Sequence, residues 1–356
     1  MTPARFSAAR RRAVAVSGDA SLVTGPLSGY HHESYVVPLL DGTKVKFREP
    51  RRSVLWFDRR YFESEDALLR SLSGRVERVP AVLASEGGLS VQTFIEGRTL
   101  AASHAPGRRV PAVILCQIVA LFGQLARITP GTLGAERRRG ARNHSEDGDS
   151  GGFLEWLTVF AEQQVYEGNR AEFGSLYRAL GVPDDAFDRL RKHVAGLRKR
   201  PFCLLHADLH RKNLIVDPQQ RLWTIDWELA LFGDPLYDLA THLHLMRYPV
   251  RQERRMVQAW CAAVEEVREG SSYGYASDLQ RLLAFKRVQS LFTDVIRVAL
   301  SLGDAPGPGR PVLRAAARRL QEVLAAAAEP LGLENVPSRA RIVAELARWH
   351  REREAP

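Results

Sequence analysis

Two neighbouring segments decide the fold: residues 204–216 read LLHADLHRKNLIV, and residues 222–228 read LWTIDWE. The apolar runs at 214–216 and 222–225 predict two short strands, because turn-forming or polar residues bound each run. The residues between them, DPQQ at 217–220, begin with an Asp-Pro pair that is typical of a tight turn. The sequence therefore predicts a β-hairpin here.

The hairpin brings two polar side chains together at its open end. Asn213 precedes the first strand and Asp226 follows the second, so we expect their oxygen atoms to converge. Carboxylate and amide oxygens are ligands that Mg²⁺ prefers in proteins. Asp208 lies on the loop that enters this site, where a carboxylate can accept a hydroxyl proton.

These motifs resemble those of a known family. HADLHRKN at 206–213 and IDWE at 225–228 are similar to the catalytic and metal-binding loops of aminoglycoside phosphotransferases and choline kinases, which are related in plan to protein-kinase loops. The resemblance implies an α+β, protein-kinase-like fold of two lobes. The N-terminal lobe is then a small antiparallel sheet, and the C-terminal lobe is larger and mostly helical.

The resemblance also implies roles for individual residues. With ATP and Mg²⁺ as cofactors, Asp208 is the catalytic base, Asn213 and Asp226 are the Mg²⁺ ligands, and His206 braces the catalytic loop. GDPLYDLA at 233–240 looks like the stretch that follows the family's metal-binding loop. Its two aspartates are expected to tie down that loop and to cap a helix rather than to act on substrate.

The N-terminal part predicts the smaller lobe. A hairpin is expected from strands at 35–40 and 44–48 around the Asp41-Gly42 turn. Ser64 is expected to cap a helix with apolar residues spaced through Leu72 and an end at Gly74, and further strands are predicted at 79–83 and 89–95. The predicted division is a basic arm at 1–25, a nucleotide-binding lobe at 26–96 and a helical catalytic and acceptor-binding lobe at 97–356.

The resemblance extends to the nucleotide site. FIEGRTL at 94–100 looks like the family's segment after the hinge between the lobes, which implies that Gln92 to Phe94 offer backbone groups to adenine. Residues 28–35 would be the phosphate-covering loop, in which Ser28, Gly29 and backbone amides could reach phosphate oxygens. The two histidines that follow at 31 and 32 are unusual there.

The basic residue that holds the ATP phosphates is left open between two positions. Lys46 and Arg48 share one face of their strand. Similarity to aminoglycoside kinases would favour the lysine and similarity to choline kinases the arginine, and the distance from the Asp41-Gly42 turn favours Arg48. Glu65 is expected either to pair with that residue or to serve only as an acid in the first turn of its helix.

Composition excludes several classes of protein. Three widely separated cysteines argue against a disulfide framework or a zinc site, and no apolar run approaches the length of a membrane span. The formal net charge is +10, yet no nucleic-acid motif is present. We therefore expect a cytoplasmic protein without nucleic-acid or membrane partners, with a mobile polar loop at 129–152.

The acceptor is less constrained than the ATP site. His210 stands where protein kinases usually carry lysine, which favours a kinase of small molecules. The expected reaction moves the γ-phosphate of Mg·ATP to a hydroxyl of a natural product such as an aminoglycoside. The alternatives are a kinase for Ser or Thr of a ribosomal precursor peptide in natural-product biosynthesis, favoured by the positive charge, and a pseudokinase that only binds ligands.

Overall fold

The computed structural model describes residues 7–27, 29, 31–51, 57–138, 146–303 and 307–354. The chain divides into two compact units. The first comprises Met1–Arg142 and Phe202–Ser271, and the second comprises Asn143–Pro201 and Ser272–Pro356. The boundary predicted after residue 96 falls inside the first unit, and the catalytic hairpin belongs to that unit as well.

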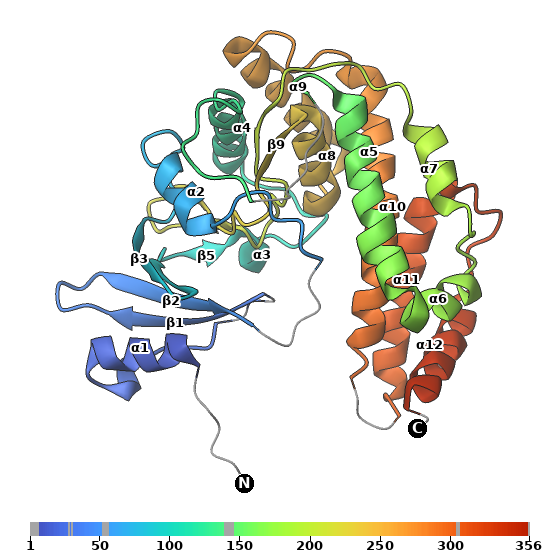
Figure 1. The fold of residues 1–356 in the computed structure, drawn as a ribbon, viewed down its shortest axis with the longest axis horizontal. Coiled ribbons are helices and arrows are strands. Elements are labelled where there is room, and N and C mark those ends of the chain that lie inside the picture. Colours follow the sequence, from blue (N-terminus) through green and yellow to red (C-terminus); the bar gives the residue numbers. More distant parts are fainter. Residues whose placement is uncertain are drawn as a thin grey trace. The chain divides into compact units, whose positions relative to one another are not determined.

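A four-stranded antiparallel sheet begins the first unit (Figure 1). Its strands lie in the order β1-β2-β4-β3, with bounds His32–Pro38, Lys44–Pro50, Leu89–Thr93 and Val82–Glu86. The predicted hairpin between β1 and β2 is confirmed. Its turn is closed by Asp41, which accepts a hydrogen bond from the Thr43 N–H at 2.9 Å. Strand β3 starts three residues later than predicted.

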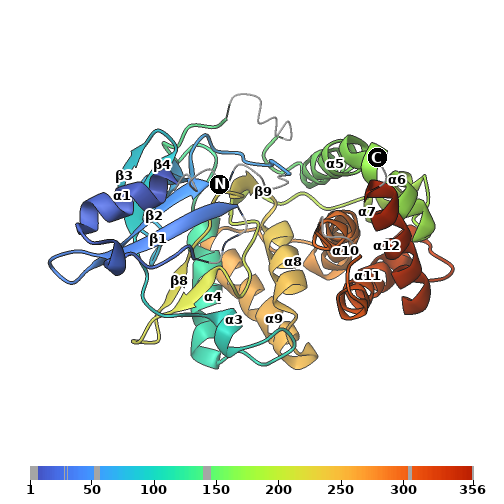
Figure 2. The same cartoon turned by 90° about the horizontal axis from the view of Figure 1, so that it is seen from below.

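A helix occupies part of the segment predicted as a basic arm. Helix α1 (Ala8–Ser17) starts at Ser7, whose hydroxyl accepts from the Arg10 N–H, and stops at Gly18 with φ 69°. Ala9 and Ala13 are fully buried in one cluster with Phe47 and other apolar residues of β1 and β2. Alanine has no bulk beyond Cβ, so the helix lies close against the sheet (Figure 2).

Helix α2 (Glu65–Leu72) begins at the predicted cap and ends two residues before Gly74, its predicted end. The Ser64 hydroxyl accepts from the Ala67 N–H, and Leu68, Leu69 and Leu72 are buried. The cap therefore fixes where the helix begins, and the leucines fix which face packs against the sheet. Glu65 stands in the first turn as a result.

Two smaller sheets carry the catalytic segments. β5 (Arg98–Thr99), β7 (Leu214–Val216) and β8 (Leu222–Thr224) form one, and β6 (Cys203–Leu205) pairs with β9 (Leu231–Gly233) in the other. Gly97 precedes β5 with φ 150°, and a Cβ there would lie 2.4 Å from the Val216 carbonyl oxygen. Only glycine allows this approach, which accounts for the glycine of the FIEGRTL segment.

Helices complete the first unit. They are α3 (Leu100–Ser103), α4 (Ala112–Ala126), α8 (Pro235–Met246) and α9 (Val250–Val267). The polar stretch predicted as a loop is partly fastened to this unit: the Glu63 N–H donates to the Glu136 carbonyl at 3.0 Å, and the Arg138 N–H donates to the Tyr61 carbonyl at 2.9 Å. Among the described residues, none of the helices combines the length and apolar character needed to cross a membrane.

The second unit is helical throughout its described elements, as the predicted fold class requires. Its longer helices are α5 (Ser150–Phe160), α6 (Arg170–Ala179), α7 (Ala186–Val194), α10 (Tyr275–Leu300), α11 (Arg310–Leu331) and α12 (Arg339–Glu354). Aromatic side chains fill part of its core, where the rings of Phe187 and Phe292 stack with centroids 4.5 Å apart. A buried ion pair joins Arg200 to Asp278 at 2.8 Å.

Candidate active site

The predicted hairpin of β7 and β8 is present and has the predicted turn. Leu214 pairs with Thr224, and the Gln220 N–H closes the turn on the Asp217 carbonyl at 2.9 Å. The pairing continues one step further, because the Ile225 N–H donates to the Asn213 carbonyl at 3.0 Å. Asp226 therefore comes directly after the residue that pairs with Asn213.

Asn213 also contacts the residue predicted as the base. Its amide Nδ2 donates to the main-chain carbonyl of Asp208 at 3.0 Å and to the Asp208 carboxylate at 3.2 Å. With Nδ2 engaged in this way, the amide Oδ1 remains as the acceptor atom of Asn213. The Asp208 side chain is 28% exposed, so its carboxylate is held in place and yet accessible.

His210 lies near the same carboxylate oxygen of Asp208. Its Nδ1 accepts from the Lys212 N–H at 3.0 Å, which leaves Nε2 as the ring nitrogen that can donate. Nε2 lies 3.5 Å from the Asp208 Oδ2. The loop therefore places an imidazole next to the residue predicted as the base.

Buried groups hold the loop that carries Asp208. Asp238, on α8, accepts from the N–H groups of His206 at 3.0 Å and Ala207 at 2.8 Å. The buried His206 ring donates from Nε2 to the Ile225 carbonyl, and its Nδ1 accepts from the Asp208 N–H. Burial lowers the pKa of His206 to about 4, so it braces the loop as a neutral ring. Asp234 caps α8 by accepting from the Leu236 N–H, as expected.

The structure brings Arg48, rather than Lys46, against Glu65. Arg48 Nη1 lies 2.7 Å from a Glu65 carboxylate oxygen, and both side chains are nearly buried. The other Glu65 oxygen accepts from the Trp227 N–H at 2.9 Å. Glu65 therefore links the basic residue on β2 to the chain immediately after Asp226, in addition to standing in the first turn of α2.

Lys46 lies near the same acids, although no acid in the described part of the chain forms an ion pair with it. Burial lowers its pKa to about 8, with the charge of Arg48 acting in the same direction, whereas Glu65, Asp226 and Asp66 oppose the shift. Both basic residues thus share the field of the same acids, but only Arg48 is fixed by an ion pair.

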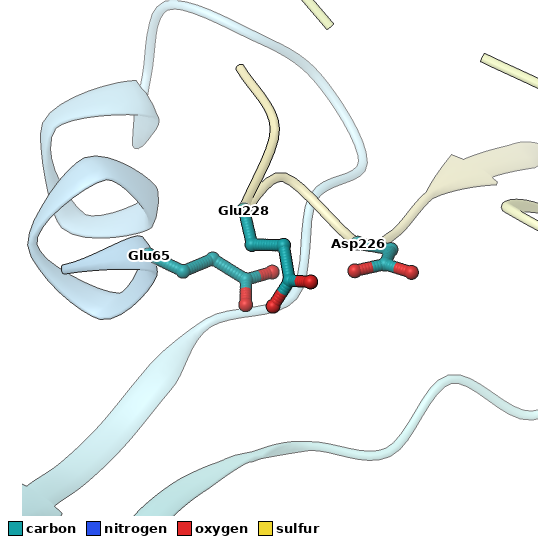
Figure 3. A group of neighbouring side chains, drawn as sticks. All are labelled: Glu65, Asp226 and Glu228. Atoms are coloured by element: carbon teal, nitrogen blue, oxygen red, sulfur yellow. The ribbon is translucent and has the colours of Figure 1, made fainter. Parts of the chain in front are cut away.

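Three acidic side chains converge beside the two basic residues of β2, as Figure 3 shows for Glu65, Asp226 and Glu228. One carboxylate oxygen of each lies within 4.8 Å of the others. Burial raises the pKa of Glu228 to about 8, and the neighbouring Asp226 and Glu65 raise it further in the same direction. The site residues predicted from the sequence did not include Glu228. The sequence feature that could have placed Glu228 in the site is its position two residues after Asp226.

Comparison with known proteins now decides the family. Residues 23–270 match the model of the phosphotransferase enzyme family, which is well over half of the chain. The chain belongs to this family. It is accordingly an ATP-dependent phosphotransferase with a hydroxyl group as acceptor.

Solved structures share the phosphotransferase's fold at low sequence identity. A choline/ethanolamine kinase family protein from Mesorhizobium loti is 17% identical, with a TM-score of 0.55, over 96% of this chain and 98% of that one. A putative aminoglycoside phosphotransferase from Ralstonia eutropha is 15% identical, with a TM-score of 0.60, over 92% and 99%. The protein-kinase-like fold predicted from the motifs is therefore confirmed.

A curated relative matches only a short part of the phosphotransferase. Mouse acyl-CoA dehydrogenase family member 11 is 30% identical over 91 residues, which is 25% of this chain. The match spans 11% of that protein's length. It therefore says nothing about the acceptor.

The segment predicted to meet adenine is largely engaged within the phosphotransferase itself. The Thr93 N–H donates to the Ala81 carbonyl, and the Phe94 N–H donates to the Lys44 carbonyl, both at 2.9 Å. The Gln92 side chain is buried and donates to Asp66 at 3.0 Å. These two N–H groups and this side chain are thus parts of the sheet and of its contact with α2.

The loop predicted to cover the phosphates is described only in part. Ser28 lies outside the described residues, whereas Gly29 lies within them, and a Cβ on Gly29 would approach the His32 carbonyl oxygen to 3.1 Å. His32, at the start of β1, reaches Arg48: both of its ring nitrogens lie 3.0 Å from Arg48 Nη2. No pattern along the chain indicates this contact, because it joins residues on neighbouring strands.

Proposed function

We propose that this enzyme transfers the γ-phosphate of Mg·ATP to a hydroxyl of a small-molecule natural product such as an aminoglycoside. The observation that carries the proposal is the contact of Asn213 with Asp208, because it joins a candidate base on the loop before the hairpin to a candidate metal ligand at the start of the hairpin. The ion pair of Arg48 with Glu65, which is fastened to the chain after Asp226, adds a phosphate-binding cation to the same site.

The residues present fit Mg²⁺. The amide oxygen of Asn213 and the carboxylate of Asp226 are hard oxygen donors, and Asp226 is held in the left-handed region with φ 68°. Asn213 and Asp226 would hold the ion, which when bound neutralises charge on the leaving diphosphate. The remaining roles in the proposed reaction are carried by side chains of the protein.

The proposed mechanism is in-line transfer with Asp208 as the base. Asp208 takes the proton of the acceptor hydroxyl while the hydroxyl oxygen bonds to the γ-phosphorus, and the bond from that phosphorus to the β–γ bridging oxygen breaks to release ADP. Asn213 and His210 hold the Asp208 carboxylate in one orientation. Arg48 holds the phosphates of ATP through its guanidinium. Catalysis in this scheme is mainly positioning.

A precursor peptide is the second candidate acceptor. The net charge of +10 favours an anionic partner over a polycationic one. In the second unit, Arg310, Arg314 and Arg318 are exposed and follow one another at four-residue spacing on α11. Such a stripe suits an acidic peptide segment, so acidic Ser/Thr peptides belong in the test beside small molecules.

The test is a coupled assay of ADP release with Mg·ATP and a panel of acceptors. The panel contains aminoglycosides, other hydroxylated natural products and acidic Ser/Thr peptides, and Asp208→Ala is the control. Acceptor-stimulated ADP release that disappears in Asp208→Ala supports the proposal and identifies the acceptor class. ADP release that is equal in the two proteins would refute Asp208 as the base. Failure to bind Mg·ATP would favour the pseudokinase alternative.

A further inference from the structure

His32 is fixed at the point where the phosphate-covering loop becomes strand β1. The Arg51 N–H donates to the His31 carbonyl at 2.8 Å, and Arg51 Nε donates to the His32 carbonyl at 3.2 Å. Strand pairing then runs from His32 opposite Pro50 along the whole of β1. The backbone on which the His32 ring stands is therefore anchored to the end of β2.

The His32 ring faces a guanidinium and a carboxylate. Both ring nitrogens lie 3.0 Å from Arg48 Nη2, and Nδ1 lies 3.7 Å from a Glu228 oxygen. Burial, together with the charge of Arg48 and lesser contributions from His31, Lys46 and Arg60, lowers the pKa of His32 to about 2. The ring is neutral, and it accepts a hydrogen bond from the guanidinium.

Arg48 is consequently held from two sides. Its Nη1 pairs with Glu65 at 2.7 Å, while its Nη2 meets His32 at 3.0 Å and stands 3.9 Å from Glu228. Glu228 is thus the next partner that Nη2 could reach. The carboxyl group of Glu228 offers oxygen acceptors at this distance, so without the ring Nη2 would turn onto Glu228.

We propose that His32 is a positioning residue for Arg48. Its neutral ring keeps the guanidinium on Glu65 and prevents Nη2 from moving from 3.9 Å into direct contact with Glu228, so that Arg48 is already oriented when the phosphates of ATP arrive. This inference rests on the proposed role of Arg48 in holding those phosphates. It also couples the phosphate-covering loop to β2, because the residue that ends the loop sets the orientation of the arginine.

Binding of the Mg²⁺ complex of a non-hydrolysable ATP analogue to the full chain tests the inference by titration calorimetry. Arg48→Ala should weaken binding by more than tenfold, and His32→Ala should weaken it by about tenfold, which is about 1.4 kcal/mol. His32→Gln should recover most of the affinity, because its amide oxygen can accept the same hydrogen bond. The double variant should bind like Arg48→Ala, since a residue that acts only through Arg48 has nothing to position without it.

His32→Leu fills a similar volume without accepting a hydrogen bond, and it should bind as weakly as His32→Ala. If His32→Ala does not fold, the affinity of His32→Leu tests the role of His32 in its place. Affinity of His32→Leu within twofold of the wild type, with Arg48→Ala weak, would overturn the role of His32 and leave the proposed function standing. A double variant weaker than Arg48→Ala by the full His32 factor would also overturn it. Unchanged affinity of Arg48→Ala would instead refute the proposed role of Arg48.

Discussion

Asp238→Asn is expected to damage the catalytic loop without touching any group that meets substrate. The Asp238 carboxylate is 1% exposed and accepts two main-chain hydrogen bonds, from His206 and Ala207. An asparagine has one acceptor oxygen and one NH₂ group, so one of the two N–H donors would face another donor. Ala207, with φ 61°, sits in the left-handed region and depends on these bonds to stay there.

The cost follows from these contacts. A buried donor left without a partner costs about 1–3 kcal/mol, and replacing a charged acceptor by a neutral one weakens the remaining bond by about 1 kcal/mol. Asp238→Asn should therefore lower the free energy of unfolding by about 2–4 kcal/mol. It should also lower kcat, because the loop that carries Asp208 loses its anchor.

Urea unfolding and acceptor-dependent ADP release measure the two effects. Asp149→Asn is the matched control: Asp149 caps α5 in the second unit by accepting from the Gly152 N–H, and asparagine caps helices about equally well. The control should stay within about 0.5 kcal/mol of the wild type. An Asp238→Asn protein as stable and active as this control would show that the two hydrogen bonds do not hold the loop.

Three further predictions test other parts of the site. Asp208→Ala should lower kcat by about 10²–10⁴-fold and leave Mg·ATP affinity within about threefold, whereas Asp226→Ala should weaken Mg·ATP binding as well. Calorimetry measures the affinities and the ADP assay measures kcat. Equal nucleotide affinity of both variants would contradict the roles proposed for the two aspartates. In urea unfolding, the free energy of unfolding of Ala207→Gly should stay within about 1 kcal/mol of the wild type, while that of Ala207→Val should fall by more than about 2 kcal/mol, because a β-branched residue tolerates φ 61° poorly. Equal losses in the two variants would show that this φ does not constrain the residue. His242 is buried and its pKa is lowered to about 3, so its ring stays neutral in the folded state, whereas in the unfolded state it takes up a proton below its ordinary pKa of about 6.5. This difference should lower the free energy of unfolding by about 1.4 kcal/mol between about pH 7.5 and 5.5. His242→Gln should remove that part of the dependence of stability on pH in urea unfolding.

The catalytic hairpin could be predicted because its determinants are local. The turn at Asp217 lies between two apolar runs that are only a few residues apart, so the strands can pair in one register. The cap at Ser64 is local in the same sense, since its hydroxyl reaches an N–H three residues along the chain. Where a contact joins residues near one another in sequence, residue types and spacing were sufficient to foresee it.

Helix α1 shows where local patterns fail. Its buried face consists of Ala9 and Ala13, and the three arginines between these alanines give the segment its basic character. Two alanines give little apolar periodicity, so the segment looks like a solvated arm until the sheet on which it packs is present. Tertiary burial, rather than the pattern along the chain, defines this helix.

The surroundings of Arg48 show the same limit within the site. The choice between Lys46 and Arg48 could not be made from the strand alone, because both residues point to one face and both could reach Glu65. Pairing of β1 with β2 brings His32 to Arg48, sixteen residues away in sequence, and this contact supports Arg48 as the proposed phosphate-binding residue. Glu228, which is further still along the chain, then stands 3.9 Å from the same guanidinium. An arginine with three partners is harder to displace than a lysine with none of these contacts, so an Arg48→Lys variant should lose the fixed orientation even though it keeps the charge.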